Sequence, residues 1–244
     1  MLAARRARTH LADDIFGALA AQLLAGEWPP GTPLPSETTL AARFVTSRIT
    51  LRQAIHRLAD LGLVQVRQGG STLALDPEQA LDPRVFELDL LLGPRSAQNI
   101  VDVTERQLLQ GHAILRLAER RADAAQLTQL ADIVEDHAAA GGHADDVPTF
   151  EERFWSACAS ATGNRLYRRE TAWWFGLLRI ADHIRHPVLG MPGERIAVMR
   201  ELVRRLTTRQ DAASLYLTVV ETLLDRLRTH LQSPGPRLDP RSSK

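Results

Sequence analysis

The sequence predicts a mainly α-helical protein with one small β-hairpin, followed by an antiparallel bundle of about six helices. Three observations support this prediction. Apolar residues recur at intervals of three, four or seven over most of the chain. Short β-prone runs replace that pattern only between residues 63 and 75. Proline and glycine cluster at 26–35 and 77–94, where regular helices must stop.

The composition is that of an ordinary folded protein. Of the 244 residues, 44% are hydrophobic and 24% are charged, which suits one large or two small domains. No apolar run approaches the ~18 residues of a membrane span, and the basic N-terminus lacks the apolar part of a secretory signal. A single cysteine, Cys158, excludes an intrachain disulfide and a cysteine-rich zinc site. We therefore expect a cytoplasmic protein without a membrane partner.

Positive charge is concentrated in one segment although the net charge is only +1. Residues 38–75 contain five arginines and one acidic residue, Asp60, and five minus one leaves a local excess of +4. A local basic excess in a nearly neutral protein is the electrostatic pattern of a nucleic-acid surface.

Three helices, a stiff loop and a hairpin are predicted in the first 75 residues. Leucines and an isoleucine spaced by four predict a helix over about 10–25, and four prolines predict an extended loop over 26–35. Ser36 and Ser47 are suitable N-caps for two short helices, the first ending near Phe44 and the second before Gly62. The runs 63–66 and 71–75 flank a turn, which completes a winged helix-turn-helix.

The rest of the chain is predicted to be helical after a linker. We expect a winged helix-turn-helix domain over residues 8–76, a linker over 77–96, an all-helical domain over 97–232 and a disordered tail over 233–244.

The second helix of a helix-turn-helix places its first residues against base edges in the major groove. Here these are short hydroxyl residues and arginines, which bind phosphates and guanines, so we expect Ser47, Arg48, Thr50 and Arg52 to face outward. The alternative is a solvated arginine face on a core helix. The loop, the helix pair and the hairpin together favour DNA.

At this point a family resemblance becomes specific. The segments that carry it are LLAG at 23–26, PGTPLPSE at 30–37, SRITLRQA at 47–54, LADLGLV at 58–64 and RQG at 67–69. In order and spacing they resemble the DNA-binding domain of the GntR family of bacterial repressors. The second half is similar to the helical effector domain of the FadR subfamily, called the FCD domain. The segments there are TER at 104–106, LAER at 117–120 and ATGN at 161–164.

The resemblance implies which residues contact the operator. They are the recognition segment, the start of the helix before it and the tip of the wing: Ser36, Thr38, Ser47, Arg48, Thr50, Arg52, Gln68 and Gly69. One position departs from the family, which usually has arginine where this chain has Thr38. That departure removes one arginine contact to DNA.

Many FCD domains hold a metal ion through one aspartate and three histidines. The matching positions here are Glu151, Trp155, Met199 and Glu221, so we expect no metal and no other cofactor. We expect an effector pocket formed instead by Arg106, Glu151, Trp155, Met199 and Glu221, in which the glutamates bind the effector or pair with Arg106 or Arg179. The alternative is that Trp155 and Met199 only fill the core.

The remaining histidines give weaker signals. His183 and His186 are three residues apart and are better explained by a helix C-terminus than by a metal site. No phosphate-binding loop, activated nucleophile or catalytic carboxylate pair is evident, so we do not expect an enzyme.

The sequence therefore predicts a ligand-responsive transcriptional regulator, acting as a repressor on the nucleoid. As a homodimer it would bind a short pseudo-palindromic operator in double-stranded DNA, and a small-molecule effector in the helical domain would alter its affinity. One alternative is a constitutive DNA-binding dimer whose helical domain is only a dimerisation scaffold. The alternative from another class is an enzyme that uses Glu151 and Glu221 as an acid–base pair.

Overall fold

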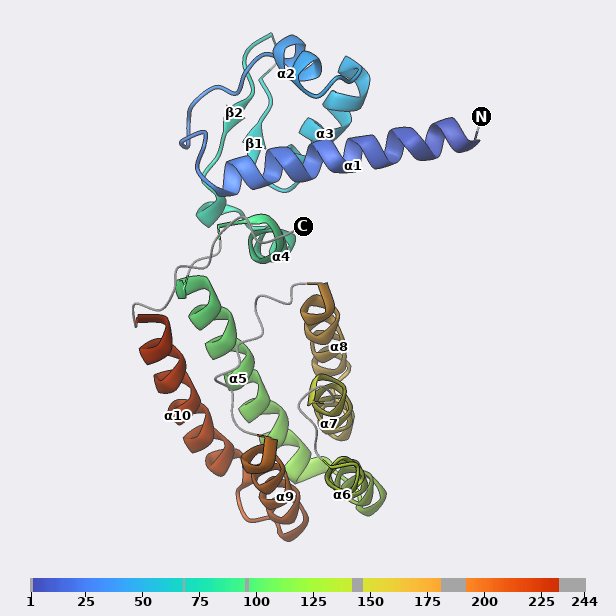
Figure 1. Cartoon of the computed structure of the whole chain (residues 1–244), viewed down its shortest axis with the longest axis vertical. Coiled ribbons are helices and arrows are strands. Elements are labelled where there is room, and N and C mark those ends of the chain that lie inside the picture. Colours follow the sequence, from blue (N-terminus) through green and yellow to red (C-terminus); the bar gives the residue numbers. More distant parts are fainter. Residues whose placement is uncertain (1, 68, 95–96, 142–146, 181–191, 233–244) are drawn as a thin grey trace. The chain divides into compact units, whose positions relative to one another are not determined.

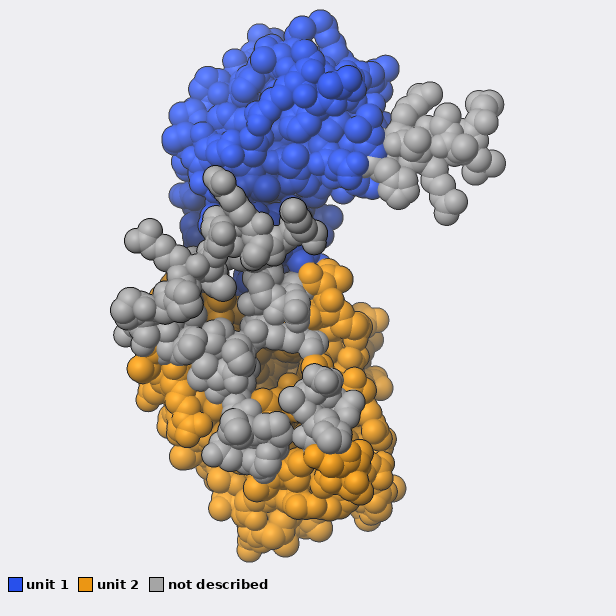
Figure 2. Space-filling model, in the orientation of Figure 1, with its two compact units in different colours: residues 1–95 blue, residues 96–244 orange. Residues whose placement is uncertain are grey.

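The computed structural model describes residues 2–67, 69–94, 97–141, 147–180 and 192–232 (Figure 1). It divides into two compact units, residues 1–95 and residues 96–244, which are coloured separately in Figure 2. The described helices and the single two-stranded sheet confirm a mainly α chain with a small antiparallel hairpin and a helical bundle. None of the described helices is long and apolar enough to cross a membrane.

The first unit is built around three helices and the hairpin. Its elements are α1 (Leu2–Leu24), α2 (Glu37–Arg43), α3 (Arg48–Asp60), β1 (Val64–Gln65) and β2 (Leu73–Ala74). The predicted apolar stripe of α1 is buried from Ile15 to Leu23, and it packs with Leu40, Leu51 and Leu58 of the next two helices. This core fixes the angle between α2 and α3 because side chains from both helices enter it.

Both predicted N-caps are present. The side-chain oxygen of Ser36 accepts a hydrogen bond from the backbone N–H of Thr39 at 3.2 Å, and Ser47 does the same for Thr50 at 3.2 Å. After α3 the chain reverses at Gly62, whose φ of +77° is a conformation that residues with a Cβ rarely adopt. Local sequence signals therefore place the starts of α2 and α3 and the end of α3, whereas α1 begins at Leu2 and not near residue 10 as predicted.

The wing includes the proline-rich loop as well as the hairpin. In the hairpin Val64 pairs with Ala74 and Gln65 with Leu73 in antiparallel register. The loop runs alongside β2, where the Leu34 N–H donates to the Thr72 carbonyl at 2.8 Å. The loop is thus held to the sheet by backbone hydrogen bonds, which suits its proline content because few of its N–H groups are needed.

The turn between α2 and α3 contains a strained residue. Val45 has a φ of +50° and an 89% exposed side chain. A β-branched residue in this left-handed region is unfavourable by about 1–2 kcal/mol, and the exposed side chain recovers little by packing. We expect Val45→Asn to raise the free energy of unfolding by about 1 kcal/mol, because asparagine tolerates this conformation.

Urea denaturation of the full chain measures this effect. Val45→Ala is the matched control, because it removes the branch but retains a Cβ, and we expect a smaller gain from it. Equal or lower stability of the asparagine variant would show that the turn is not strained.

The segment predicted as a linker contains ordered structure. It forms a short 3₁₀ turn, η1 (Pro77–Gln79), and a helix, α4 (Pro83–Leu92). Asp82 caps α4 by accepting from the Arg84 N–H at 2.9 Å, and Pro83 takes the first helical position. Val85 joins the core of the first unit, so this helix belongs to that unit's packing.

The described residues of the second unit form a bundle of six helices, in agreement with the sequence prediction of about six. Its helices are α5 (Ala97–Arg121), α6 (Ala124–Ala139), α7 (Val147–Ala161), α8 (Arg165–Ile180), α9 (Pro192–Thr208) and α10 (Ala212–Gln232). The long helices α5 and α10 lie side by side, and α7 packs on α5 and α8 (Figure 1). Phe154, Leu115 and Leu202 are completely buried at the centre.

Cys158 lies in this core and is completely buried. Burial raises the pKa of its thiol far above the usual range, so the reactive thiolate is not populated at neutral pH. We expect a thiol reagent such as Ellman's reagent to leave the native protein unmodified and to titrate one thiol after denaturation. Rapid modification of the folded protein would show that the bundle opens at this position.

Candidate functional site

The exposed surface of α3 carries the candidate nucleic-acid interface. Arg48, Ile49, Arg52 and Gln53 are all exposed in its first two turns. No ion pair or hydrogen bond to the Arg48 side chain occurs within the described residues, and its guanidinium is available to a DNA group. The α3 N-terminus also presents backbone N–H groups suited to a phosphate.

Thr50 does not face outward as the sequence analysis expects. It is only 5% exposed, and its hydroxyl lies 2.9 Å from the Ser47 hydroxyl at the helix cap. The third residue after a cap turns back toward the cap, so the hydroxyl serves the helix start. Ser47 itself is exposed. Of the two hydroxyl residues predicted on this surface, Ser47 alone lies on it.

Arg52 is held by a carboxylate from the neighbouring helix. Its Nε donates to both carboxylate oxygens of Glu37, at 2.8 and 3.0 Å. Its side chain is still 63% exposed. Because the pair uses Nε, the outer edge of the guanidinium with both Nη groups stays available for a bidentate contact to guanine. The carboxylate thus orients the arginine without covering its reading edge.

Other predicted contact residues border this surface in the same unit. Ser36 and Thr38 are exposed at the start of α2, where the Ser36 hydroxyl lies 2.8 Å from that of Thr39. Gly69 and Arg67 are exposed in the turn of the hairpin. Gln68 lies outside the described residues.

The sequence analysis passed over Ile49. This side chain is 75% exposed at the start of α3, between Arg48 and the buried Thr50. An apolar group at a major-groove surface can contact a thymine methyl group. The signal was available in the sequence, because an isoleucine outside the apolar stripe of a helix has no core to enter.

The helical unit contains a cavity of about 250 Å³. Side chains from five helices line it, α5, α7, α8, α9 and α10. Its aromatic walls are Trp155, Trp174, Phe175 and Tyr216, and its polar groups include Thr104, Gln107, Gln110 and Thr171. The charged residues that line it, within the described part of the chain, are Glu151 and Arg195.

The structure brings two of the five predicted effector residues to this cavity. Glu151 and Trp155 line it, whereas Met199 is buried in the adjacent core and Arg106 and Glu221 are exposed elsewhere. The partners predicted for Glu151 also differ. Glu151 pairs with Arg195 of α9, while Arg179 pairs with Glu152 at 2.7 Å. The sequence analysis missed Arg195 and Tyr216.

Two polar groups of the cavity wall have unused hydrogen-bonding capacity. The Gln107 amide nitrogen is buried and has no partner in the described structure. The Tyr216 residue is 7% exposed, and its hydroxyl makes no hydrogen bond to any described residue. Burial, with a smaller effect of Glu151, raises the pKa of Tyr216 above its usual range, so the hydroxyl keeps its proton and can donate.

No group of three or more metal-binding side chains gathers among the described residues. His183 and His186 lie outside those residues. His112 places its Nδ1 atom 2.9 Å from the Ala213 carbonyl, which ties α5 to α10.

Comparison with known proteins agrees with the geometry of the first unit. Residues 11–73 match the family described as bacterial regulatory proteins, gntR family. An uncharacterized HTH-type transcriptional regulator of Mycobacterium tuberculosis, Rv0494, is 35% identical over 166 residues. That alignment covers 66% of this chain and 67% of that protein, so the chain spans about two thirds of its length.

Two further proteins are similar over different extents. The histidine utilization repressor of Klebsiella aerogenes is 29% identical over 126 residues, which are 52% of this chain and 48% of that one. A solved structure of Lar, described as controlling the Listeria monocytogenes agr system, has a TM-score of 0.51 at 17% identity. It covers 89% of this chain and 96% of that one, and it shows similarity of fold. With its exposed α3, its wing and these relatives, the chain belongs to the GntR family of helix-turn-helix transcriptional regulators and is not an enzyme.

Proposed function

We propose that this protein is a ligand-responsive repressor of the FadR subfamily, with an FCD-type helical domain. It acts in the cytoplasm on double-stranded DNA. Residues 8–76 read the operator, and residues 97–232 form dimers and bind a small-molecule effector. The observation that best supports this is the pairing of an arginine-bearing α3 surface in one unit with a largely apolar cavity in the other.

The reading surface supports sequence-specific binding. Arg48 and Arg52 are four residues apart on α3, hence on one face, and both expose guanidinium groups suited to guanine. A homodimer applies two such helices to one duplex, so the operator is a short pseudo-palindrome with half-sites about one helical turn apart.

The test begins with selection of binding sequences from a random duplex pool by the full-length protein. Fluorescence anisotropy then compares the selected duplex with a shuffled one at 50 and 200 mM salt. We expect a symmetric consensus and an affinity for it that is 10³-fold or more above that for the shuffled duplex, roughly the lower limit for specific regulators. Equal, strongly salt-dependent affinity for both would contradict operator recognition.

A constitutive dimer remains the second candidate, because Thr38 replaces an arginine of the family and the metal-binding histidines are replaced. Screens of metabolites by thermal denaturation separate the two. An effector at 100 times its dissociation constant stabilises the folded protein by about 2.7 kcal/mol. A screen in which no small molecule stabilises the dimer favours the constitutive dimer, whose helical domain serves only for dimerisation.

A further inference from the structure

We propose that the cavity of the helical unit binds an uncharged, flat organic molecule of one or two rings that carries a carbonyl or similar hydrogen-bond acceptor. This inference rests on the proposed function only for its regulatory consequence. The binding site itself is argued from the cavity's own geometry and can be tested without DNA.

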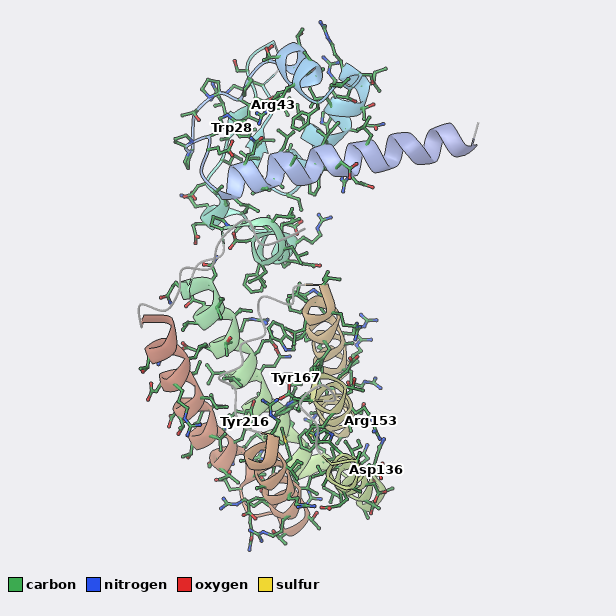
Figure 3. All side chains as sticks on the ribbon, in the orientation of Figure 1. Trp28, Arg43, Asp136, Arg153, Tyr167 and Tyr216 are labelled. Carbon is green, nitrogen blue, oxygen red and sulfur yellow. The ribbon has the colours of Figure 1, made fainter. Side chains whose placement is uncertain are left out.

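Two hydrogen-bond donors of the cavity wall have no acceptor among the described residues. Tyr216 of α10, which is labelled in Figure 3, lines the cavity with a side chain that is more than nine-tenths buried, and its hydroxyl bonds to no described residue. The Gln107 amide nitrogen, on α5, is likewise buried and without a partner in the described part of the chain. A buried donor without an acceptor is unfavourable, so a bound molecule that supplies an acceptor to the Gln107 amide is stabilised there, and the Tyr216 hydroxyl offers the same molecule a second donor.

The position of Tyr216 depends on a glycine of α5. A Cβ atom added to Gly111 would lie 2.6 Å from the Tyr216 hydroxyl oxygen, which is too close for any real contact. On its other side the ring meets Trp155 edge-on, with 5.1 Å between the centroids. The Tyr216 ring thus lies directly against Gly111, and a larger residue at position 111 would displace it.

The charges of the described wall residues favour a neutral ligand. Glu151 and Arg195 form an ion pair in which the side chains are 31% and 14% exposed. Their charges cancel, and no other charged residue lines the cavity within the described residues. An anion or a cation entering here would bring an uncompensated charge to a wall whose described charges are already paired, whereas a neutral molecule leaves the pair intact.

The volume of the cavity and the composition of its wall limit the size of the ligand. The volume of about 250 Å³ is slightly below the ~300 Å³ at which drug-sized pockets begin. Trp155, Trp174 and Phe175 supply aromatic faces and edges that pack well against another ring. A long acyl chain or a nucleotide exceeds this space.

The test uses calorimetric titration of the full-length protein, without DNA, with three compounds of two fused rings that differ in charge. Coumarin is neutral and carries a lactone carbonyl, 2-naphthoate is an anion, and 2-naphthylmethylammonium is a cation. We expect coumarin to bind with the lowest Kd. Stronger binding of either ion, or binding of none of the three, would overturn the proposal. The last result is also what a cavity filled only by water would give.

Tyr216→Phe tests the donor directly. It retains the ring and removes only the hydroxyl, so we expect about five- to tenfold weaker coumarin binding, the effect of one lost hydrogen bond. The midpoint of thermal unfolding without ligand should not fall, because that hydroxyl has no partner to lose. Tyr167→Phe, at the other tyrosine of the chain, on α8 outside the cavity lining, is the matched control and should bind coumarin normally (Figure 3). Unchanged coumarin binding by the Tyr216 variant would show that the Tyr216 hydroxyl does not contact the ligand.

A final comparison separates this proposal from the proposed function. Operator affinity is measured by anisotropy with and without saturating coumarin. Coumarin binding with no effect on DNA affinity supports the site and contradicts ligand responsiveness. Operator binding by a protein that takes up no coumarin overturns the site and leaves the regulator intact.

Discussion

Arg52→Ala should weaken binding to the selected operator by about 1–3 kcal/mol, roughly 5- to 150-fold. The reason is geometric. Glu37 holds the Nε edge of Arg52, and the free Nη edge is then presented to the groove in one orientation. Loss of a bidentate base contact also relaxes discrimination at one base pair of each half-site. The measurement is anisotropy with the operator and with single-substitution duplexes.

Arg57→Ala is the matched control on the same helix. Arg57 pairs with Asp13 of α1 at 2.6 Å and lies over the Phe16 ring at 4.2 Å, so its guanidinium is engaged within the first unit. We expect its loss to leave operator discrimination unchanged. If Arg52→Ala weakened all duplexes equally and lowered the salt dependence, Arg52 would contact phosphate instead of a base.

Phe154→Ala should lower the free energy of unfolding of the helical unit by about 3–5 kcal/mol. Phe154 is completely buried and meets the rings of Trp155 and Phe150, with centroids 5.6 and 6.3 Å away. Its removal leaves a cavity next to the wall residue Trp155, and dense packing cannot close it fully. Such a loss is a large part of the ~5–15 kcal/mol that stabilises a typical domain.

Urea denaturation followed by circular dichroism measures this loss, with separate transitions fitted for the two units. Leu166→Ala is the control, because Leu166 is 59% exposed on α8 and its truncation should cost less than about 0.5 kcal/mol. A Phe154 variant as stable as the control would mean that the bundle core repacks freely.

Signals that act within a few residues were readable from the sequence. Ser36, Ser47 and Gly62 each act through the backbone of their own helix, so their residue types are enough to place the helix ends. Helix α4 shows that a local signal can be present in the sequence and still be misinterpreted. Asp82 and Pro83 are a helix start signal, but among neighbouring prolines they suggested only a linker.

The cavity could be predicted only in part. Glu151 and Trp155 were found through a family pattern on one helix, but the partner of Glu151 is 44 residues further along the chain. No local periodicity links such positions, and the packing of α9 and α10 against α5 decides which side chains meet. The prediction that Thr50 faces outward was wrong for a related reason, because its hydroxyl contacts the Ser47 hydroxyl at the helix cap.

The Glu37–Arg52 pair has a consequence for how the protein searches a genome. A carboxylate fixed beside an arginine repels the phosphates of any duplex, while it barely disturbs a guanine edge reached through the opposite side of the guanidinium. We therefore expect the pair to reduce affinity for random DNA more than affinity for the operator. Since competing sites outnumber operators by about 10⁶ or more, we expect this pair to shorten each non-productive visit and so to free the regulator for its target sites.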